Sequence, residues 1–351
     1  MRRALAANEP VRALQQAHAF NDGTPLTLVL LGHAYLCFGS VLAARTCYAA
    51  AGAEEELRKL DELTHQWLDH PGRLSHLFPP PARNHRVAHA TGVKRLDGQL
   101  KVLNEVGLGY SLYQPDSNSA SIIGVAVCFH GNGENADAYQ VIASTHFFPH
   151  GLALLCVEYR GYGRSTAHPP KLTSLLSDVE PLVENDELLS TVFAQAGLSR
   201  SLPMIIFGRS LGAHAAIHLC ALSVAVGKAQ WAAGLVLDSA VGSVRHWEAE
   251  VPDDDGGDAD GRPPLPGAPA VHTIGLLENL GKMRALVALP TLLLHGSEDA
   301  LVPPFQAELL RRCHPAARLV HIAGHGHNDL AHAPEYSVAI ANFVYETITS
   351  R

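Results

Sequence analysis

The chain has 351 residues, of which 47% are hydrophobic and 17% charged, and its formal net charge is −8 at pH 7. This length suffices for one large domain or for one domain with an appendage, and the hydrophobic fraction indicates a well-buried core. The negative charge and the lack of a basic cluster argue against nucleic acid as a partner. The six cysteines are scattered without a C-x-x-C pair, so we expect buried thiols in a cytoplasmic protein rather than disulfides or a metal site.

Residues 1–78 are predicted to be helical, because alanine, leucine, glutamine and glutamate dominate and β-branched residues are few. The basic start is not followed by an apolar run, so a secretory signal is not expected. Residues 26–53 are apolar, but His33 and Arg45 interrupt them. We therefore expect a buried pair of helices there and no transmembrane span.

Within this segment, residues 25–58 resemble a single tetratricopeptide repeat. The pattern L-G-x-x-Y followed by A-x-x-x-Y-x-x-A is carried by Leu31, Gly32, Tyr35, Ala44, Tyr48 and Ala51. Small residues at these positions would let two helices approach closely. Fewer than three such repeats do not normally stand alone. The pattern therefore fits a helical hairpin docked on the main domain and a module that binds a protein partner about equally well.

The proline-rich residues 79–84 are predicted to be a linker to a domain over 85–351. Alternating apolar and polar residues on both sides of Asp97-Gly98 predict a β-hairpin with its turn at that dipeptide. Six apolar strands then alternate with helices, which favours an α/β fold with a mostly parallel sheet covered on both faces. The strands are expected at about 122–129, 152–159, 204–207, 234–237, 291–295 and 319–322, and the helices at about 136–147, 171–196, 211–226, 306–313 and 334–349. Acidic and proline-rich residues at about 250–270 lack the EF-hand spacing, so they predict a flexible loop rather than a calcium site.

The most informative motif is Gly208-Arg209-Ser210-Leu211-Gly212. It follows the apolar run 204–207 and precedes a helix-like segment. This order of strand, G-x-S-x-G and helix is typical of a nucleophile elbow, in which a tight turn exposes the serine oxygen. Glycine is needed on both sides because the strand and the helix approach too closely for a Cβ. We predict Ser210 as a catalytic nucleophile.

Serine needs a base, and the base needs an acid to orient it. In this architecture both follow later strands, in the order acid then histidine. Asp299 follows the strand that ends near 295, and we prefer it to Glu298, which we expect to face solvent, and to Asp238. His327 follows the last strand, and we prefer it to His325 because Gly326 permits the turn that aims the ring at Ser210.

His321 lies within the last strand and is expected to be packed rather than catalytic. Two backbone amides are predicted to stabilise the oxyanion that forms on the substrate. One belongs to Leu211, at the start of the helix, and the other to Asn132, in the glycine-containing loop after the strand 122–129. His130, which precedes that loop, is expected to brace it rather than to act as a second base.

Five motifs in chain order resemble the α/β-hydrolase superfamily of serine hydrolases over about residues 85–350. They are H-G-N-G-E at 130–134, E-Y-R-G-Y-G-R-S at 158–165, G-R-S-L-G at 208–212, H-G-S-E-D at 295–299 and G-H-N-D at 326–329. The branch that they resemble most holds the α/β-hydrolase-domain proteins 13 and 17 and the Bem46-like proteins. The resemblance implies a structural role for the turn with Arg160, Gly161 and Gly163.

The predicted function is hydrolysis of a carboxylic ester or thioester through an acyl-enzyme, with Ser210, His327 and Asp299 as the triad and no metal or organic cofactor. The short segment at about 240–285 suggests a small lid, with Trp247 and Tyr162 near an open cleft for a small or lipid-like acyl substrate. Two alternatives stay open. One is a serine peptidase or amidase, and the other is a non-catalytic scaffold that uses the N-terminal helices.

Overall fold

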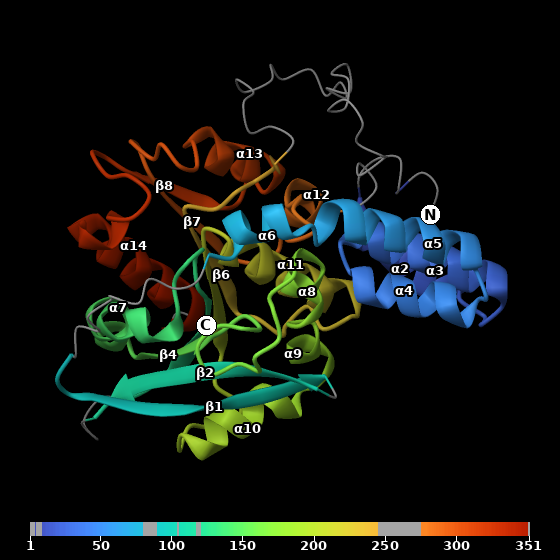
Figure 1. Ribbon diagram of the computed structural model, residues 1–351. Helices are drawn as coiled ribbons and strands as arrows, with labels where there is room; N and C mark the ends of the chain where they lie inside the picture. Colours follow the sequence, from blue (N-terminus) through green and yellow to red (C-terminus); the bar gives the residue numbers. More distant parts are fainter. Residues whose placement is uncertain are drawn as a thin grey trace.

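The computed structural model describes Ala4 and residues 9–79, 90–103, 105–116, 121–244 and 275–349 (Figure 1). Most of the predicted linker and the predicted loop at about 250–270, with Trp247, lie outside the described residues.

One sheet of eight strands forms the centre of the described chain, in the order β1-β2-β4-β3-β5-β6-β7-β8. From β4 to β8 in this order, all neighbouring strands are parallel, whereas β1 and β2 join as an antiparallel edge. The strands are β1 (Val93–Leu103), β2 (Val106–Pro115), β3 (Gly124–Phe129), β4 (Leu152–Val157), β5 (Met204–Arg209), β6 (Gly234–Asp238), β7 (Thr291–Gly296) and β8 (Arg318–Ile322).

The central strands are buried on both faces because their apolar residues alternate between two cores. In β3, Val125, Val127 and Phe129 pack into one apolar cluster, while Ala126 and Cys128 pack into another. The first cluster contains residues of α9 (Pro181–Glu184), α10 (Glu187–Gln195), α11 (Gly212–Ala225), α12 (Leu280–Arg284) and α13 (Phe305–Cys313). The second contains residues of α7 (Tyr139–Ile142), the flanking turns η2 (Ala136–Ala138) and η3 (Ala143–Phe147), and α14 (Pro334–Val344). The predicted α/β class, with a mostly parallel sheet covered on both faces, is confirmed.

The N-terminal helices are here called the arm (residues 9–79). Most of them project to one side of the sheet, and the last one leads back over it (Figure 1). They are α2 (Pro10–Phe20), α3 (Pro25–Phe38), α4 (Val41–Ala50), α5 (Glu54–Leu63), η1 (Thr64–Leu68) and α6 (Pro71–Leu77). Val11, Leu14 and Phe38 belong to the same apolar cluster as the sheet residues. None of the helices in the described ranges is both long and apolar enough to cross a membrane.

The predicted pair α3 and α4 is present, and its close approach depends on Gly32. A Cβ at Gly32 would lie 2.4 Å from the Tyr48 ring, so only glycine fits there. Whether this hairpin is a tetratricopeptide repeat stays a prediction, as do the domain boundaries at 78 and 84.

The predicted position of the β-hairpin turn is wrong. Asp97 and Gly98 lie inside β1, paired with Ser111 and Tyr110 of β2, and the chain reverses between Leu103 and Val106. A Cβ at Gly98 would lie 2.5 Å from the Tyr110 hydroxyl oxygen. The glycine is therefore required by a cross-strand aromatic ring rather than by a turn.

The single helix predicted over 171–196 is instead three short helices, α8 (Leu172–Ser177), α9 and α10. Pro181 opens α9, where its missing N–H costs no helical bond. The side chain of Asn185 then accepts a hydrogen bond from the Glu187 amide at 3.1 Å, which is typical of a turn between helices.

Candidate active site

Ser210 lies in the tight turn between β5 and α11 and has a φ of +50°, a left-handed conformation that is rare for residues other than glycine. The two flanking glycines make the turn possible. A Cβ at Gly212 would lie 2.0 Å from the Phe129 carbonyl oxygen, and one at Gly208 would lie 2.7 Å from the Ala213 Cα. The G-x-S-x-G pattern thus lets α11 pack directly against β3 and β5.

The structure brings Ser210, His327 and Asp299 together, although 117 residues separate the serine from the histidine. The Ser210 Oγ lies 3.0 Å from His327 Nε2, and His327 Nδ1 lies 2.8 Å from Asp299 Oδ2. Asp299 follows β7 and His327 follows β8, so both stand at the carboxyl edge of the sheet beside the end of β5. This arrangement permits the proton of Ser210 to pass to the imidazole while Asp299 holds the ring.

Asp299 is surrounded by hydrogen-bond donors. Its Oδ1 accepts from the backbone amides of Leu301 at 3.0 Å and Val302 at 2.8 Å, while His295 Nε2 lies 3.4 Å from Oδ2. Burial by itself raises the pKa of Asp299, but the hydrogen bonds from His295, His327 and the Val302 amide outweigh it and hold the pKa well below its usual range. The carboxylate therefore stays ionised and can stabilise an imidazolium.

The competing acids and the second loop histidine lie elsewhere. His325 is partly exposed, and its Nδ1 lies 2.9 Å from the carbonyl oxygen of Ala323. Glu298 is exposed. Asp238 is buried, and the Tyr336 hydroxyl donates to its carboxylate at 3.0 Å. None of these three side chains is hydrogen-bonded to Ser210 Oγ in the described chain, although the Ser210 amide donates to the Asp238 carbonyl at 2.8 Å.

The expectation that His321 is packed inside the last strand is wrong. His321 is exposed, and its Nε2 lies 2.9 Å from Glu308 Oε1. The incomplete burial of β8 explains why this expectation was wrong. β8 is an edge strand, paired only with β7 among the described strands, and only Ile322 in it is fully buried.

The two predicted oxyanion donors lie at the ends of β5 and β3. Leu211 is the N-cap of α11, where the helix dipole favours negative charge. Asn132 is exposed in the loop after β3, next to Gly133 with a φ of +71°. Within the described part of the chain, neither backbone amide donates to a backbone carbonyl.

His130, at the start of this loop, is completely buried. Its Nδ1 donates to the Gly131 carbonyl at 2.9 Å, its Nε2 lies 3.1 Å from Glu158 Oε2, and its own carbonyl accepts from the Tyr159 hydroxyl at 2.6 Å. Burial lowers the pKa of His130, but the hydrogen bond and charge of Glu158 outweigh it and raise the pKa above its usual range. These contacts suit a brace for the loop rather than a second base.

Arg209 is a site residue that the sequence analysis did not identify. Its guanidinium pairs with Glu134 of the oxyanion loop and donates to the His327 carbonyl at 2.8 Å and to Asn328 Oδ1 at 3.0 Å. It therefore joins the serine turn, the oxyanion loop and the histidine loop. The only signal in the sequence was a charged residue at the variable position of G-x-S-x-G.

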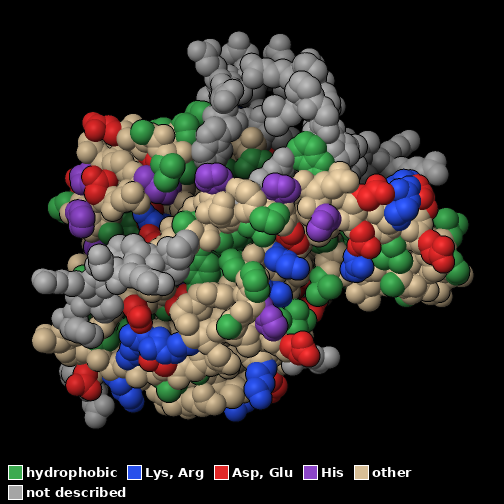
Figure 2. Space-filling view, in the orientation of Figure 1, with side chains coloured by type: hydrophobic (Ala, Val, Ile, Leu, Met, Phe, Trp, Pro, Cys, Tyr) green, Lys and Arg blue, Asp and Glu red, His purple; other side chains and the backbone are tan. Residues whose placement is uncertain are grey.

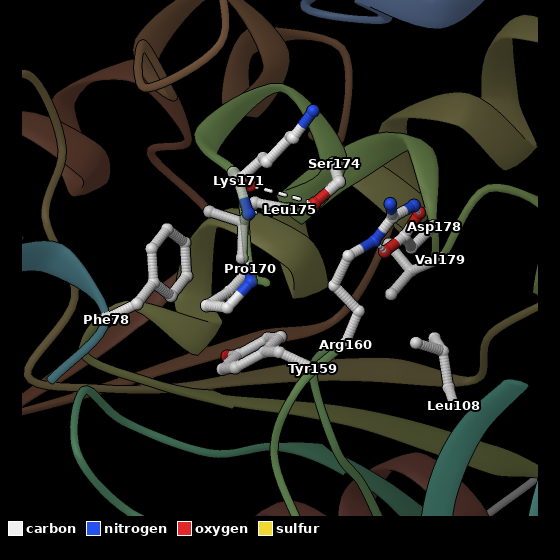
Figure 3. Close-up of a pocket in the computed structure, with 10 residues that line it drawn as sticks. All are labelled: Phe78, Leu108, Tyr159, Arg160, Pro170, Lys171, Ser174, Leu175, Asp178 and Val179. Carbon is white, nitrogen blue, oxygen red and sulfur yellow. Dashed lines mark hydrogen bonds and ion pairs between the residues drawn. The ribbon is translucent and has the colours of Figure 1, made fainter. Parts of the chain in front are cut away.

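A small pocket lies between the end of the arm and the segment after β4 (Figure 3). Phe78 and Tyr159 are among its lining residues, and Ser210 is not. Arg160 donates from Nε to Asp178 Oδ2 at 2.6 Å in its wall. Tyr162, which we expected near an open cleft, is 3% exposed, and its hydroxyl donates to the Pro79 carbonyl at 2.7 Å.

Acidic and basic side chains are interspersed on the face shown in Figure 2, without a patch of one sign. No cluster of three or more histidine, cysteine, aspartate or glutamate residues that could hold a metal ion occurs in the part of the chain that the structure describes.

Comparison with known proteins points to hydrolases. A family model described as "Serine aminopeptidase, S33" matches residues 120–251, which include the oxyanion loop and Ser210 but end before Asp299 and His327. A monoacylglycerol lipase of Mycolicibacterium smegmatis is 25% identical over 234 residues, which cover 58% of this chain and 79% of the lipase.

Solved structures of esterases resemble the chain in fold. Est1E of Butyrivibrio proteoclasticus, solved with ferulic acid bound, has a TM-score of 0.52 and 16% identity over 72% of this chain and 99% of Est1E. Carboxyl esterase 2 of the fungus Tuber melanosporum has a TM-score of 0.52 and 17% identity over 74% of this chain and 88% of the esterase. Taken with the sheet order and the nucleophile turn, these likenesses show that the chain has the α/β-hydrolase fold, with additional N-terminal helices.

Proposed function

We propose that this protein is a serine hydrolase that cleaves a carboxylic ester or thioester through an acyl-enzyme. The observation that carries the proposal is the hydrogen-bonded chain from Ser210 Oγ to His327 Nε2 at 3.0 Å and from His327 Nδ1 to Asp299 Oδ2 at 2.8 Å. The likeness to a monoacylglycerol lipase favours an ester of a lipid-like acyl group.

In the first half of the reaction, Ser210 Oγ attacks the carbonyl carbon while His327 Nε2 accepts the serine proton. The carbonyl oxygen becomes an oxyanion, which the amides of Leu211 and Asn132 stabilise. Each such donor is typically worth about 3 kcal/mol in the transition state. His327 then returns the proton to the leaving alcohol or thiol, and Ser210 retains the acyl group.

In the second half, water loses a proton to His327 and attacks the acyl-enzyme. The ester bond to Ser210 breaks, and the proton returns from His327 to Ser210 as the acid leaves. Asp299 stays ionised throughout because its hydrogen bonds hold its pKa low. No step requires a metal or an organic cofactor.

A second candidate is cleavage of an amide or peptide bond by the same residues, which the description of the matching family model favours. Placement in the branch of α/β-hydrolase-domain proteins 13 and 17 stays a prediction. So do cytoplasmic localisation and a protein partner for the arm.

A fluorophosphonate probe and a series of p-nitrophenyl esters test the proposal. The wild type should be labelled and should turn over the esters, whereas Ser210→Ala should show neither property. Thioester and amide substrates with the acyl group of the best ester then separate the two candidates. A folded wild-type protein that is neither labelled nor active on any of these substrates would contradict both.

A further inference from the structure

The end of the arm reaches the oxyanion loop. Three contacts join residues 76–79, here called the clamp, to the loop or to the residues that brace it. Asn132 Nδ2 donates to the His76 carbonyl at 3.2 Å, the Tyr162 hydroxyl donates to the Pro79 carbonyl at 2.7 Å, and the Phe78 ring packs edge-on to the Tyr159 ring with centroids 6.5 Å apart.

The two tyrosines carry these contacts to the start of the loop. The Tyr159 ring lies 4.4 Å from the His130 ring, centroid to centroid, and the Tyr162 ring lies 5.6 Å from it. The Tyr159 hydroxyl also donates to the His130 carbonyl at 2.6 Å. His130 is followed directly by Gly131 and Asn132, so these rings pack against the residue from which the oxyanion loop begins.

The clamp is itself well anchored. Phe78 is 7% exposed and belongs to an apolar cluster that also contains Leu60 and Leu68 of the arm and Leu211 beside the nucleophile. Figure 3 shows Phe78 and Tyr159 among the residues that line the small pocket. Asn132 therefore contacts the arm directly, and Leu211 shares an apolar cluster with it.

Oxyanion stabilisation depends on donors held in position before the reaction, because a loose donor must be ordered during the transition state. The oxyanion loop contains two glycines and an exposed Asn132, so the position of the Asn132 amide depends on contacts with neighbouring segments. We propose that the clamp positions the Asn132 amide, and that the arm is therefore part of the catalytic unit rather than an independent appendage. This inference rests on the proposed function.

The test uses the full chain with Tyr162→Phe, Phe78→Leu and the double variant. Tyr162→Phe keeps the ring but removes the bond to Pro79, and Phe78→Leu keeps an apolar side chain but removes the aromatic contact. Fluorophosphonate titration counts active sites, so that kcat is given per labelled serine. We expect kcat on a p-nitrophenyl ester to fall roughly 3–10-fold in each single variant and further in the double variant, with KM changed less than about twofold.

A boronic acid inhibitor provides the readout that a merely structural role would not change. It forms a tetrahedral adduct whose oxygen occupies the oxyanion site, so its inhibition constant should rise by the same factor by which kcat falls.

Two control variants lose comparable bonds away from the loop. Gln15→Ala removes a side-chain amide that donates to the Val224 carbonyl at 3.1 Å, also between the arm and the domain. Tyr110→Phe removes a hydroxyl that donates to Gln195 at 3.3 Å. Both should retain wild-type kcat.

An active wild type, with clamp variants whose kcat per labelled serine equals that of the controls, would overturn the clamp and leave the proposed function standing. The proposed role of the clamp would also be rejected if kcat dropped in its variants while their boronic acid binding stayed as tight as in the wild type. An inactive, unlabelled wild type would overturn both proposals. If Phe78→Leu does not fold, Tyr162→Phe alone decides the question.

Discussion

Two buried carboxylates in this molecule respond to burial in opposite ways. Asp299, at the candidate active site, and Glu180, beneath the arm, are 3% and 7% exposed. Burial raises the pKa of both, but the donors around Asp299 reverse the effect, whereas the pKa of Glu180 rises to about 7. Glu180 Oε1 lies 2.9 Å from His218 Nε2, and burial lowers the pKa of that histidine well below its usual value.

Burial also affects the charge of Lys282, which interacts electrostatically with Glu180 and His218. Lys282 is fully buried, donates to the Gly275 carbonyl at 3.1 Å and lies over the Phe38 ring. Burial lowers its pKa to about 7, although Glu180 opposes the shift. The comparison teaches that burial alone does not set a charge. Two backbone amides and two imidazoles keep Asp299 ionised, whereas Glu180 has fewer donors and its charge depends on pH.

The largest losses of activity are expected from substitutions at Asp299 and His327. Asp299→Asn and His327→Ala should each lower kcat on a p-nitrophenyl ester by about 10³–10⁴-fold, because the base loses its orientation or is absent. His325→Ala is the matched control and should stay within about twofold of wild type. The assignment of the base would be wrong if the two histidine variants exchanged these results.

The next effect concerns Arg209, which joins three loops through its fork of donors. Lysine keeps the charge but cannot make the same set of bonds. Arg209→Lys should therefore lower kcat by roughly 10–100-fold, measured with the same ester. Arg160→Lys breaks a comparable bond to Asp178 outside the site, and it should lower the melting temperature while kcat stays near wild type. Equal kcat values for the two variants would argue against a role for Arg209 in positioning the site.

The pH dependence of stability tests the charge of buried Glu180. The pKa of Glu180 is raised in the folded state from 4.5 to about 7, so its contribution to stability is present below pH 4.5 and is lost as the pH rises through 7. The shift corresponds to about 3 kcal/mol. Glutamine does not titrate, so Glu180→Gln should gain stability relative to wild type between pH 5 and pH 8.

Urea unfolding of both proteins at these two pH values measures the difference, because titratable groups that do not interact with Glu180 cancel. Parallel changes with pH in the two proteins would show that Glu180 is ionised in the fold throughout this range.

The smallest effect is expected on the exposed surface of the arm. Arg45 pairs with Asp61, and their side chains are 49% and 51% exposed. Water screens such a pair, so Arg45→Ala should change the free energy of unfolding by no more than about 0.5 kcal/mol. Urea unfolding at one pH is sufficient to measure it. A loss of several kcal/mol, as expected for a buried ion pair, would show that solvent exposure does not explain the weak contribution of this pair.

The regular part of the fold followed from local patterns. Each of the six strands predicted after residue 120 is present, because apolar runs bounded by turn residues specify buried strands. The misplaced hairpin turn and the broken helix over 171–196 have a common cause. Gly98 looks like a turn residue until Tyr110 packs over it, and the Pro181 and Asn185 signals are weaker than the apolar periodicity around them.

For the site, the five residues predicted from motif and chain order lie at the carboxyl edge of the sheet, but their geometry came from the fold. Arg209 and the clamp were not predicted, because no local motif marks them and their partners lie 50 or more residues away in the chain.

Residue types and spacing alone determined the α/β class, the tight turn at Ser210 and the loops that deliver Asp299 and His327. These features depend on backbone sterics and on periodicities within about ten residues. Tertiary structure alone decided the distance between His327 and Ser210, how Asp299 keeps its charge, and that the arm touches the oxyanion loop. Those outcomes depend on distances and burial between distant segments, which no local pattern encodes.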